Sequence, residues 1–209
     1  MVPDAADLAR AVVIAQASPR ARRNAFHVSA VASLRDYGFA TLLVDLLTIE
    51  EKTSATAPPR TELLAERLEA ATQFLRGQLE NDQPAIGYFA TGTASSAALL
   101  AAAILSQAIG AVVLVGPRSL RLPLRADDVT AAVLLIVGGT ASELESGCAV
   151  RDRLRCHSEV VMVPGATLPC KGDPRPRHLA IQLAVDWLAK HLRNEGIERD
   201  GGRRALVAP

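Results

Sequence analysis

The stretch Pro84-Ala-Ile-Gly-Tyr-Phe-Ala-Thr-Gly-Thr-Ala-Ser-Ser96 decides the fold class that we predict for this chain of 209 residues. Its first half is a short apolar run bounded by Pro84, which is typical of a buried strand. Its second half is rich in Ala and Ser and begins a helix. Gly92 lies between the two halves, so we expect a sharp turn from strand to helix with Gly92 at its apex.

The same alternation of apolar runs and longer amphipathic segments continues on both sides of this stretch. The nearly continuous apolar character of the runs favours strands of a parallel sheet that is covered on both faces. The sequence therefore predicts a doubly wound α/β fold with a mostly parallel, six-stranded sheet and helices on both faces. The expected strands are 11–15, 40–45, 85–89, 111–115, 133–137 and 160–163, and the expected helices are 24–37, 62–79, 94–108, 143–155 and 177–192.

The chain is expected to form one domain over residues 1–192, followed by a flexible C-terminal tail at 193–209. The segment 50–59 is polar and rich in proline, and we interpret it as a surface loop. The segment 118–130 contains Pro123 and few periodic apolar positions, so it is a second expected excursion.

Composition excludes several classes of function. The formal net charge is +1, which gives no electrostatic case for nucleic acid or an anionic membrane. No apolar run approaches the length of a membrane span, and the first residues do not resemble a secretory signal. The three cysteines have no metal-ligand spacing and form no CxxC pair. We expect a cytoplasmic protein without a metal or a cofactor.

The turn around Gly92 allows three interpretations. A phosphate-binding loop requires Lys and then Ser or Thr after its second glycine, but Thr93 and Ala94 follow Gly92. A dinucleotide fingerprint requires a third glycine that is absent here. The remaining interpretation is a nucleophile elbow, in which small residues flank the apex because strand and helix pass close together. Ala90 and Ala94 meet that requirement.

With this elbow in place, the chain resembles small bacterial α/β-hydrolases of the dienelactone-hydrolase type, including a branch joined to phosphoribosyltransferase domains. The resemblance extends from about Ala11 to Leu192, and it implies the strand order 2-1-3-4-5-6. It is carried by the segments Gly38-Phe-Ala-Thr-Leu-Leu-Val-Asp-Leu-Leu-Thr48, Leu63-Leu-Ala-Glu-Arg-Leu68, Ile86-Gly-Tyr-Phe89, Leu134-Leu-Ile-Val-Gly-Gly139, Val163-Pro-Gly-Ala-Thr167 and Ala184-Val-Asp-Trp-Leu188.

The resemblance also implies where a catalytic triad would stand. The nucleophile position falls on Gly92, the acid position on Ala141 or Ser142, and the histidine position on Leu168. Without a hydroxyl or thiol there is no covalent acyl intermediate, and without an imidazole there is no group to take and return a proton. We therefore expect no catalytic residue at these positions.

Other residues could form a rebuilt site, and the sequence leaves that alternative open. Ser95 or Cys170 would supply the nucleophile and His178 the base of an ester or lactone hydrolase. Ser95 lies in the first turn of a helix, where its hydroxyl is expected to point away from the mouth of the site. His178 is expected at the surface near a helix start.

His27 is expected at the surface or in a helix cap, and Asp45 is interpreted as a carboxylate that caps a loop.

The leading hypothesis is a catalytically inactive homologue that acts by binding. Its ligand would be a small anionic or ester-like molecule held over the elbow, or its partner another protein. Backbone N–H groups after the apex would attract an anion. The expected ligand-binding residues are Gln16, Ala17, Thr91, Gly92 and Thr93. A purely structural subunit with a filled cleft is a third possibility.

Overall fold

The computed structural model describes residues 10–17, 24–54, 60–79, 84–117, 125–164 and 174–192. The expected tail at 193–209 and residues 118–124 of the excursion expected at 118–130 lie outside these ranges. The strands are β1 (Arg10–Gln16), β2 (Ala40–Asp45), β3 (Ala85–Thr91), β4 (Ile109–Val115), β5 (Ala132–Val137) and β6 (Ser158–Met162). The helices are α1 (Ala25–Asp36), α2 (Ile49–Ser54), α3 (Thr61–Gly77), α4 (Ala94–Leu105), α5 (Ala141–Arg151) and α6 (Pro174–His191), with short 3-10 turns η3 (Ser106–Ala108) and η4 (Ala126–Asp128).

Within the described residues, the six strands form one sheet in the order β2-β1-β3-β4-β5-β6, and every pair is parallel. This confirms the predicted fold class and strand order. The chain runs from β1 outward to β2, returns to β3, and then proceeds outward through β6. The direction of winding therefore reverses between β1 and β3, which is where open α/β sheets bind their ligands.

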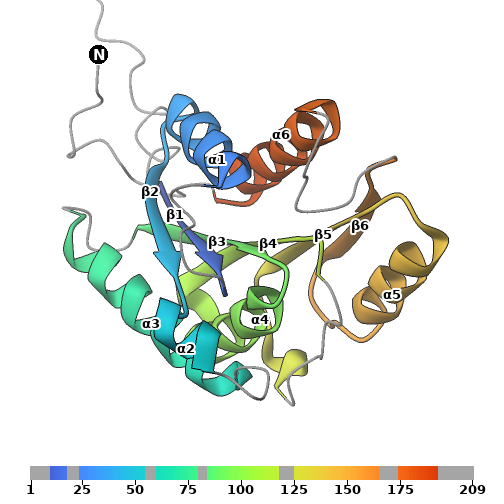
Figure 1. The fold of residues 1–209 in the computed structure, drawn as a ribbon. Coiled ribbons are helices and arrows are strands. Elements are labelled where there is room, and N and C mark those ends of the chain that lie inside the picture. Colours follow the sequence, from blue (N-terminus) through green and yellow to red (C-terminus); the bar gives the residue numbers. More distant parts are fainter. Residues whose placement is uncertain are drawn as a thin grey trace, which may run out of the picture.

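Helices cover both faces of the sheet (Figure 1). The helices α1 and α6 lie on one face, and α2, α3, α4 and α5 lie on the other. Alternate residues of each strand supply the two cores: Val13 and Tyr88 belong to the α3–α4 side, whereas Ile14 and Phe89 belong to the α1–α6 side. Helix α4 contains nine buried residues, which agrees with its apolar composition.

The segment after β2 differs from its prediction. Residues 49–54 form α2, so the expected loop at 50–59 begins as a helix, and 55–59 lie outside the described residues. The reason is a capping box: the Glu51 amide donates to Thr48 Oγ1 at 3.1 Å, and the Thr48 amide donates to Glu51 Oε2 at 2.9 Å. The spacing Thr-x-x-Glu is a signal for the start of a helix, but the polar composition of the segment favoured a loop.

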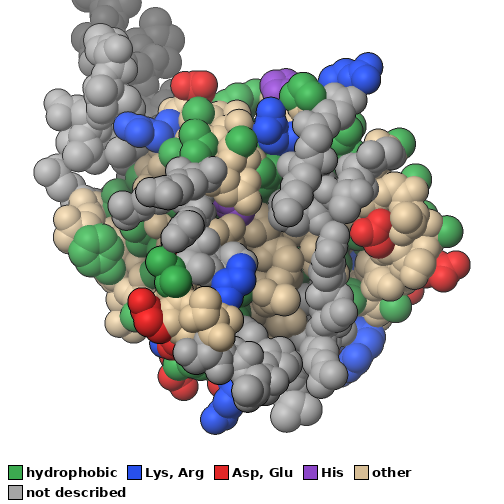
Figure 2. Space-filling model, in the orientation of Figure 1, with side chains coloured by type: hydrophobic (Ala, Val, Ile, Leu, Met, Phe, Trp, Pro, Cys, Tyr) green, Lys and Arg blue, Asp and Glu red, His purple; other side chains and the backbone are tan. Residues whose placement is uncertain are grey.

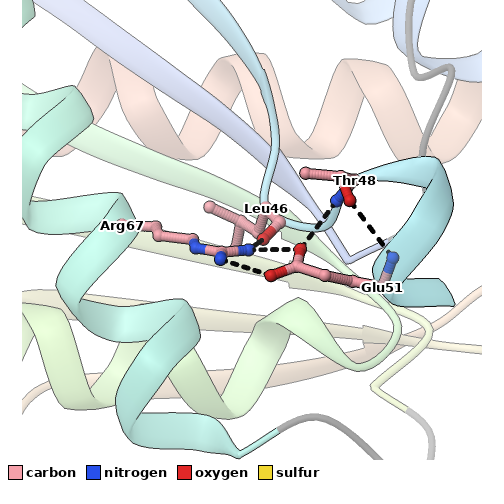
Figure 3. Close-up of polar contacts among 4 residues, drawn as sticks. All are labelled: Leu46, Thr48, Glu51 and Arg67. Atoms are coloured by element: carbon pink, nitrogen blue, oxygen red, sulfur yellow. Dashed lines mark hydrogen bonds and ion pairs between the residues drawn. The ribbon is translucent and has the colours of Figure 1, made fainter. Parts of the chain in front are cut away.

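Helix α3 secures this short helix through Arg67 (Figure 3). The guanidinium donates to both Glu51 carboxylate oxygens, at 2.7 and 2.5 Å, and to the Leu46 carbonyl at 2.7 Å. These hydrogen bonds from Arg67 hold the pKa of Glu51 down at about 2. The contact fixes the chain just after the carboxyl end of β2, close to Asp45.

The surface carries no large area of one charge on the face that Figure 2 shows. Basic and acidic side chains are scattered among hydrophobic ones over the part that is coloured by residue type. Among the described helices, none is both long and apolar enough to cross a membrane.

Candidate functional site

The turn after β3 has the geometry that the sequence predicted for an elbow. Gly92 has a φ of +57°, a conformation that residues with a Cβ rarely adopt. Its amide donates to the Val115 carbonyl at 3.1 Å, and its carbonyl accepts from the Ser95 amide at 3.2 Å. A Cβ placed on Gly92 would meet no described atom within 4 Å. Among the described residues nothing crowds the apex, and its backbone is held by the neighbouring strand and helix.

The position implied for the acid lies at the start of α5. Ala141 is exposed as the first residue of this helix, and Thr140 caps it by accepting from the Glu143 amide at 3.3 Å. A cavity of about 390 Å³ lies beside it, between the carboxyl ends of β4 and β5 and the face of α5. Its described lining is mainly apolar, with Ser142, Glu143 and Ser146 as polar members. The position implied for the histidine, Leu168, lies outside the described residues.

The alternative nucleophile and base do not share a location. Ser95 has no exposed surface, and no described group forms a hydrogen bond with its hydroxyl. His178 is exposed on α6, where it lines a shallow hollow together with Pro174, Arg175, Leu179 and Gln182. Ser95 belongs to α4 and His178 to α6, so they come from helices on opposite faces of the sheet (Figure 1). Cys170 falls outside the described ranges.

Three polar residues end the three neighbouring strands on the β2–β1–β3 side of the sheet. Gln16 pairs in register with Asp45 of β2 on one side and with Thr91 of β3 on the other. The Gln16 amide nitrogen donates to Asp45 Oδ1 at 3.1 Å. The alternation of the strands places all three side chains on the face covered by α1 and α6. We call this set, together with His27, the polar cluster.

His27 joins the polar cluster from α1, and its expected place at the surface or in a helix cap is wrong. The side chain has no exposed surface, and its Nε2 lies 3.1 Å from Thr91 Oγ1. Asn24, rather than His27, caps α1 by accepting from the Phe26 amide. Burial lowers the pKa of His27 to about 4, although the nearby Asp45 charge opposes that shift. The imidazole is therefore neutral at neutral pH.

A sequence signal for this burial existed. His27, Ala30 and Leu34 follow a spacing of three and four, which puts them on one stripe of the helix, and all three are buried. A polar side chain near a helix start is usually a surface residue, so the residue type favoured an exposed position for His27 over the apolar stripe. Asp45, interpreted as a loop cap, accepts a hydrogen bond from Gln16.

The described side chains do not suggest a metal centre. Among them, no three His, Cys, Asp or Glu residues stand close enough together to hold an ion. The polar cluster contains one imidazole and one carboxylate, and its remaining members are an amide and a hydroxyl. This composition suits hydrogen bonding to an organic molecule better than metal coordination.

An all-parallel sheet in this strand order, with a sharp turn into a helix after β3, defines the α/β-hydrolase fold. A solved dienelactone hydrolase from Anabaena variabilis is 32% identical to this chain with a TM-score of 0.77, and the match covers 90% of this chain and 88% of that one. The chain belongs to the dienelactone hydrolase family. No family model matches it.

Two further similarities extend this picture. The esterase domain of a Rhodothermus marinus protein shares the fold at 16% identity, with a TM-score of 0.65 over 92% of both chains. Proteins of two Mycobacterium tuberculosis strains, named "Putative phosphoribosyl transferase", are 35% identical over 186 residues. That match covers 88% of this chain and 42% of theirs, so the chain spans less than half the length of these relatives.

Proposed function

We propose that this protein is a non-hydrolytic member of the family, which binds a small molecule at the carboxyl edge of its sheet. The observation that carries the proposal is Gly92: the elbow has a left-handed backbone and no described atom crowds its apex, but it has no reactive side chain. Ala141 and Leu168 stand where the resemblance implies an acid and a histidine. A binding function requires none of these reactive groups.

The cavity beside α5 supports a binding role over a purely structural one. Its volume of about 390 Å³ falls within the usual range for small-molecule sites. A lining that combines apolar residues with a few polar ones is also typical of such sites. A protein with a filled cleft would not need this space.

Hydrolase activity and binding can be separated by a direct test. The purified protein is treated with a fluorophosphonate probe, and serine labelling is mapped by mass spectrometry alongside turnover of a panel of p-nitrophenyl esters. We expect no labelled serine and no turnover above buffer, while an esterase with a serine nucleophile gives both in parallel. Turnover that disappears in His178→Ala would instead establish the rebuilt site with Ser95 or Cys170.

A further inference from the structure

We infer that the cavity beside α5 takes a ligand with an apolar body and a protonated amine, and that the Glu143 carboxylate binds the amine. This inference rests on the proposed function, because it names the ligand class of the same cavity. It differs from both ligand types that the sequence suggests, which are an anionic and an ester-like molecule.

Two helices of the protein begin with the spacing Thr-x-x-Glu, and they differ in what the glutamate binds. In α2, Glu51 accepts hydrogen bonds from the Arg67 guanidinium as well as from the Thr48 amide (Figure 3). In α5, the Glu143 carboxylate accepts from Thr140 Oγ1 at 2.7 Å. Among the described residues, no lysine, arginine or histidine lies within ion-pair distance of Glu143. A cationic ligand would supply at α5 what Arg67 supplies at α2.

The capping residue orders the Glu143 carboxylate beside the cavity. The Thr140 hydroxyl accepts from the Glu143 amide at 3.3 Å and donates to Glu143 Oε2, which holds the side chain at the first turn of α5. A carboxylate can accept about four hydrogen bonds through its two oxygens. Within the described part of the chain, no group donates to Oε1, and Glu143 lines the cavity. The carboxylate therefore keeps capacity for a ligand that donates hydrogen bonds.

A serine of the lining also presents an acceptor. Ser146 Oγ donates to the Ser142 carbonyl at 2.8 Å, so the hydroxyl hydrogen is used within α5 and the oxygen remains to accept. Glu143 is the charged member of the described lining. An ammonium group carries a positive charge and three N–H donors, and it is complementary to a carboxylate beside a hydroxyl acceptor.

The apolar part of the cavity determines the rest of the ligand. Leu135 and Val137 of β5 and Val150 of α5 line it, and all three side chains are buried. Gly147 lets α5 approach the sheet here, because a Cβ on it would lie 3.0 Å from the Cγ1 atoms of Val137 and Val160. The walls are thus set by close packing, and a small apolar body between them would remove further apolar surface from water.

The test uses three ligands of similar shape and different charge. Phenethylamine is a cation at pH 7.5, 2-phenylethanol is neutral and phenylacetate is an anion, and each is titrated into the protein by ligand-observed NMR. We expect the amine to bind most tightly and phenylacetate least tightly, because Glu143 attracts the first and repels the second. Added salt should weaken binding of the amine and leave that of the alcohol unchanged, since salt screens a partly exposed ion pair.

A charge-removing variant tests the role of Glu143. Glu143→Gln should weaken amine binding by about tenfold, because a charge-assisted hydrogen bond becomes a neutral one. Binding of the alcohol should not change. Glutamine keeps an oxygen that can accept from Thr140, so α5 keeps its cap. Glu145→Gln removes the same charge from an exposed residue of α5 that is not among the described lining residues, and it is the matched control.

A cavity-filling variant tests the location of the ligand independently of charge. Ser146→Leu places a larger side chain in the cavity, so the amine and the alcohol should both bind several-fold more weakly. Ala149→Leu adds the same side chain at an exposed position of α5 outside the described lining, and it should change neither affinity. Thermal denaturation of each variant verifies that it is folded.

The outcomes separate this inference from the proposed function. The inference is overturned if the amine does not bind, if the alcohol or phenylacetate binds as tightly, or if Glu143→Gln leaves the amine affinity unchanged. Unchanged affinities in Ser146→Leu also overturn it, because the ligand would then lie elsewhere. The proposed function fails separately: a fragment collection containing cations, neutral molecules and anions would yield no ligand in the same NMR assay.

Discussion

At Gly92 the backbone has a φ of +57°, and no described atom lies within 4 Å of the place that a Cβ would occupy. A Cβ at this site would contact no described atom, but the residue would experience backbone strain. The loss of stability that we expect on substitution therefore comes from the backbone conformation and not from packing. Gly92 shows that the left-handed turn of the elbow forms here at a residue without a side chain.

Gly92→Ser should lower the free energy of unfolding by about 1–3 kcal/mol, because a non-glycine residue in this region is strained. It should give no ester turnover. A nucleophile alone lacks a proton carrier, since Leu168 stands at the implied histidine position and His27 already contacts Thr91 through Nε2. Thermal denaturation and a p-nitrophenyl acetate assay provide the measurement. Gly92→Ala is the control, with the same strain and no hydroxyl; turnover in the serine variant alone would refute this argument.

At the scale of the elements, the side chains at the C-terminal end of α6 pack closely on β3 at Gly87. A Cβ on Gly87 would lie 2.8 Å from both Leu188 Cδ2 and Leu192 Cδ1, and 3.3 Å from the Ala111 carbonyl oxygen. Glycine at this strand position therefore permits the helix to pack directly on the sheet. The continuous apolar run predicted a buried strand here, but the distance to α6 came only from the fold.

Gly87→Ala should destabilise the protein by about 1–3 kcal/mol, because the extra methyl group overpacks this contact. Gly77→Ala is a matched control near the end of α3, where a Cβ would meet no described atom within 4 Å. There we expect a gain of about 0.5–1 kcal/mol from the higher helix propensity of alanine. Urea denaturation of both variants provides the measurement, and equal effects at the two sites would show that the α6 contact is not tight.

For the whole molecule, the buried neutral imidazole couples stability to pH. The pKa of His27 falls from 6.5 to about 4 on folding because burial disfavours the charged form. Between these values the unfolded chain binds the proton and the folded chain does not. The stability associated with a neutral His27 is thus complete above pH 6.5 and is lost as the pH falls toward 4.

We expect the loss of unfolding free energy between pH 7.5 and pH 4.5 to be about 2–3 kcal/mol larger in the wild type than in His27→Gln. Comparing the two proteins at both values removes the contribution of carboxylates that titrate in each. Urea denaturation at both pH values provides the measurement. Parallel pH profiles for the two proteins would mean that His27 is solvated or paired in the folded state.

Much of the architecture was predictable because its causes are local. The apolar runs at 85–89 and 111–115 indicated buried strands, and small residues around Gly92 indicated the sharp turn. The capping box of Thr48 and Glu51 was equally local, but the polar, proline-rich residues around it favoured a surface loop. The strand order followed from resemblance to a family, because local patterns do not specify which strands become neighbours.

The sequence by itself determined that strands and helices alternate and that glycine occupies the apex, because periodicity and chirality act within a few residues. Only the tertiary structure decided that His27 contacts Thr91, 64 positions along the chain. The spacing of His27, Ala30 and Leu34 indicated one buried stripe of α1, but it did not specify how the helix would be oriented over the strands. That orientation follows from packing of α1 against β1, β2 and α6 together, and it is what places a neutral imidazole beneath the elbow.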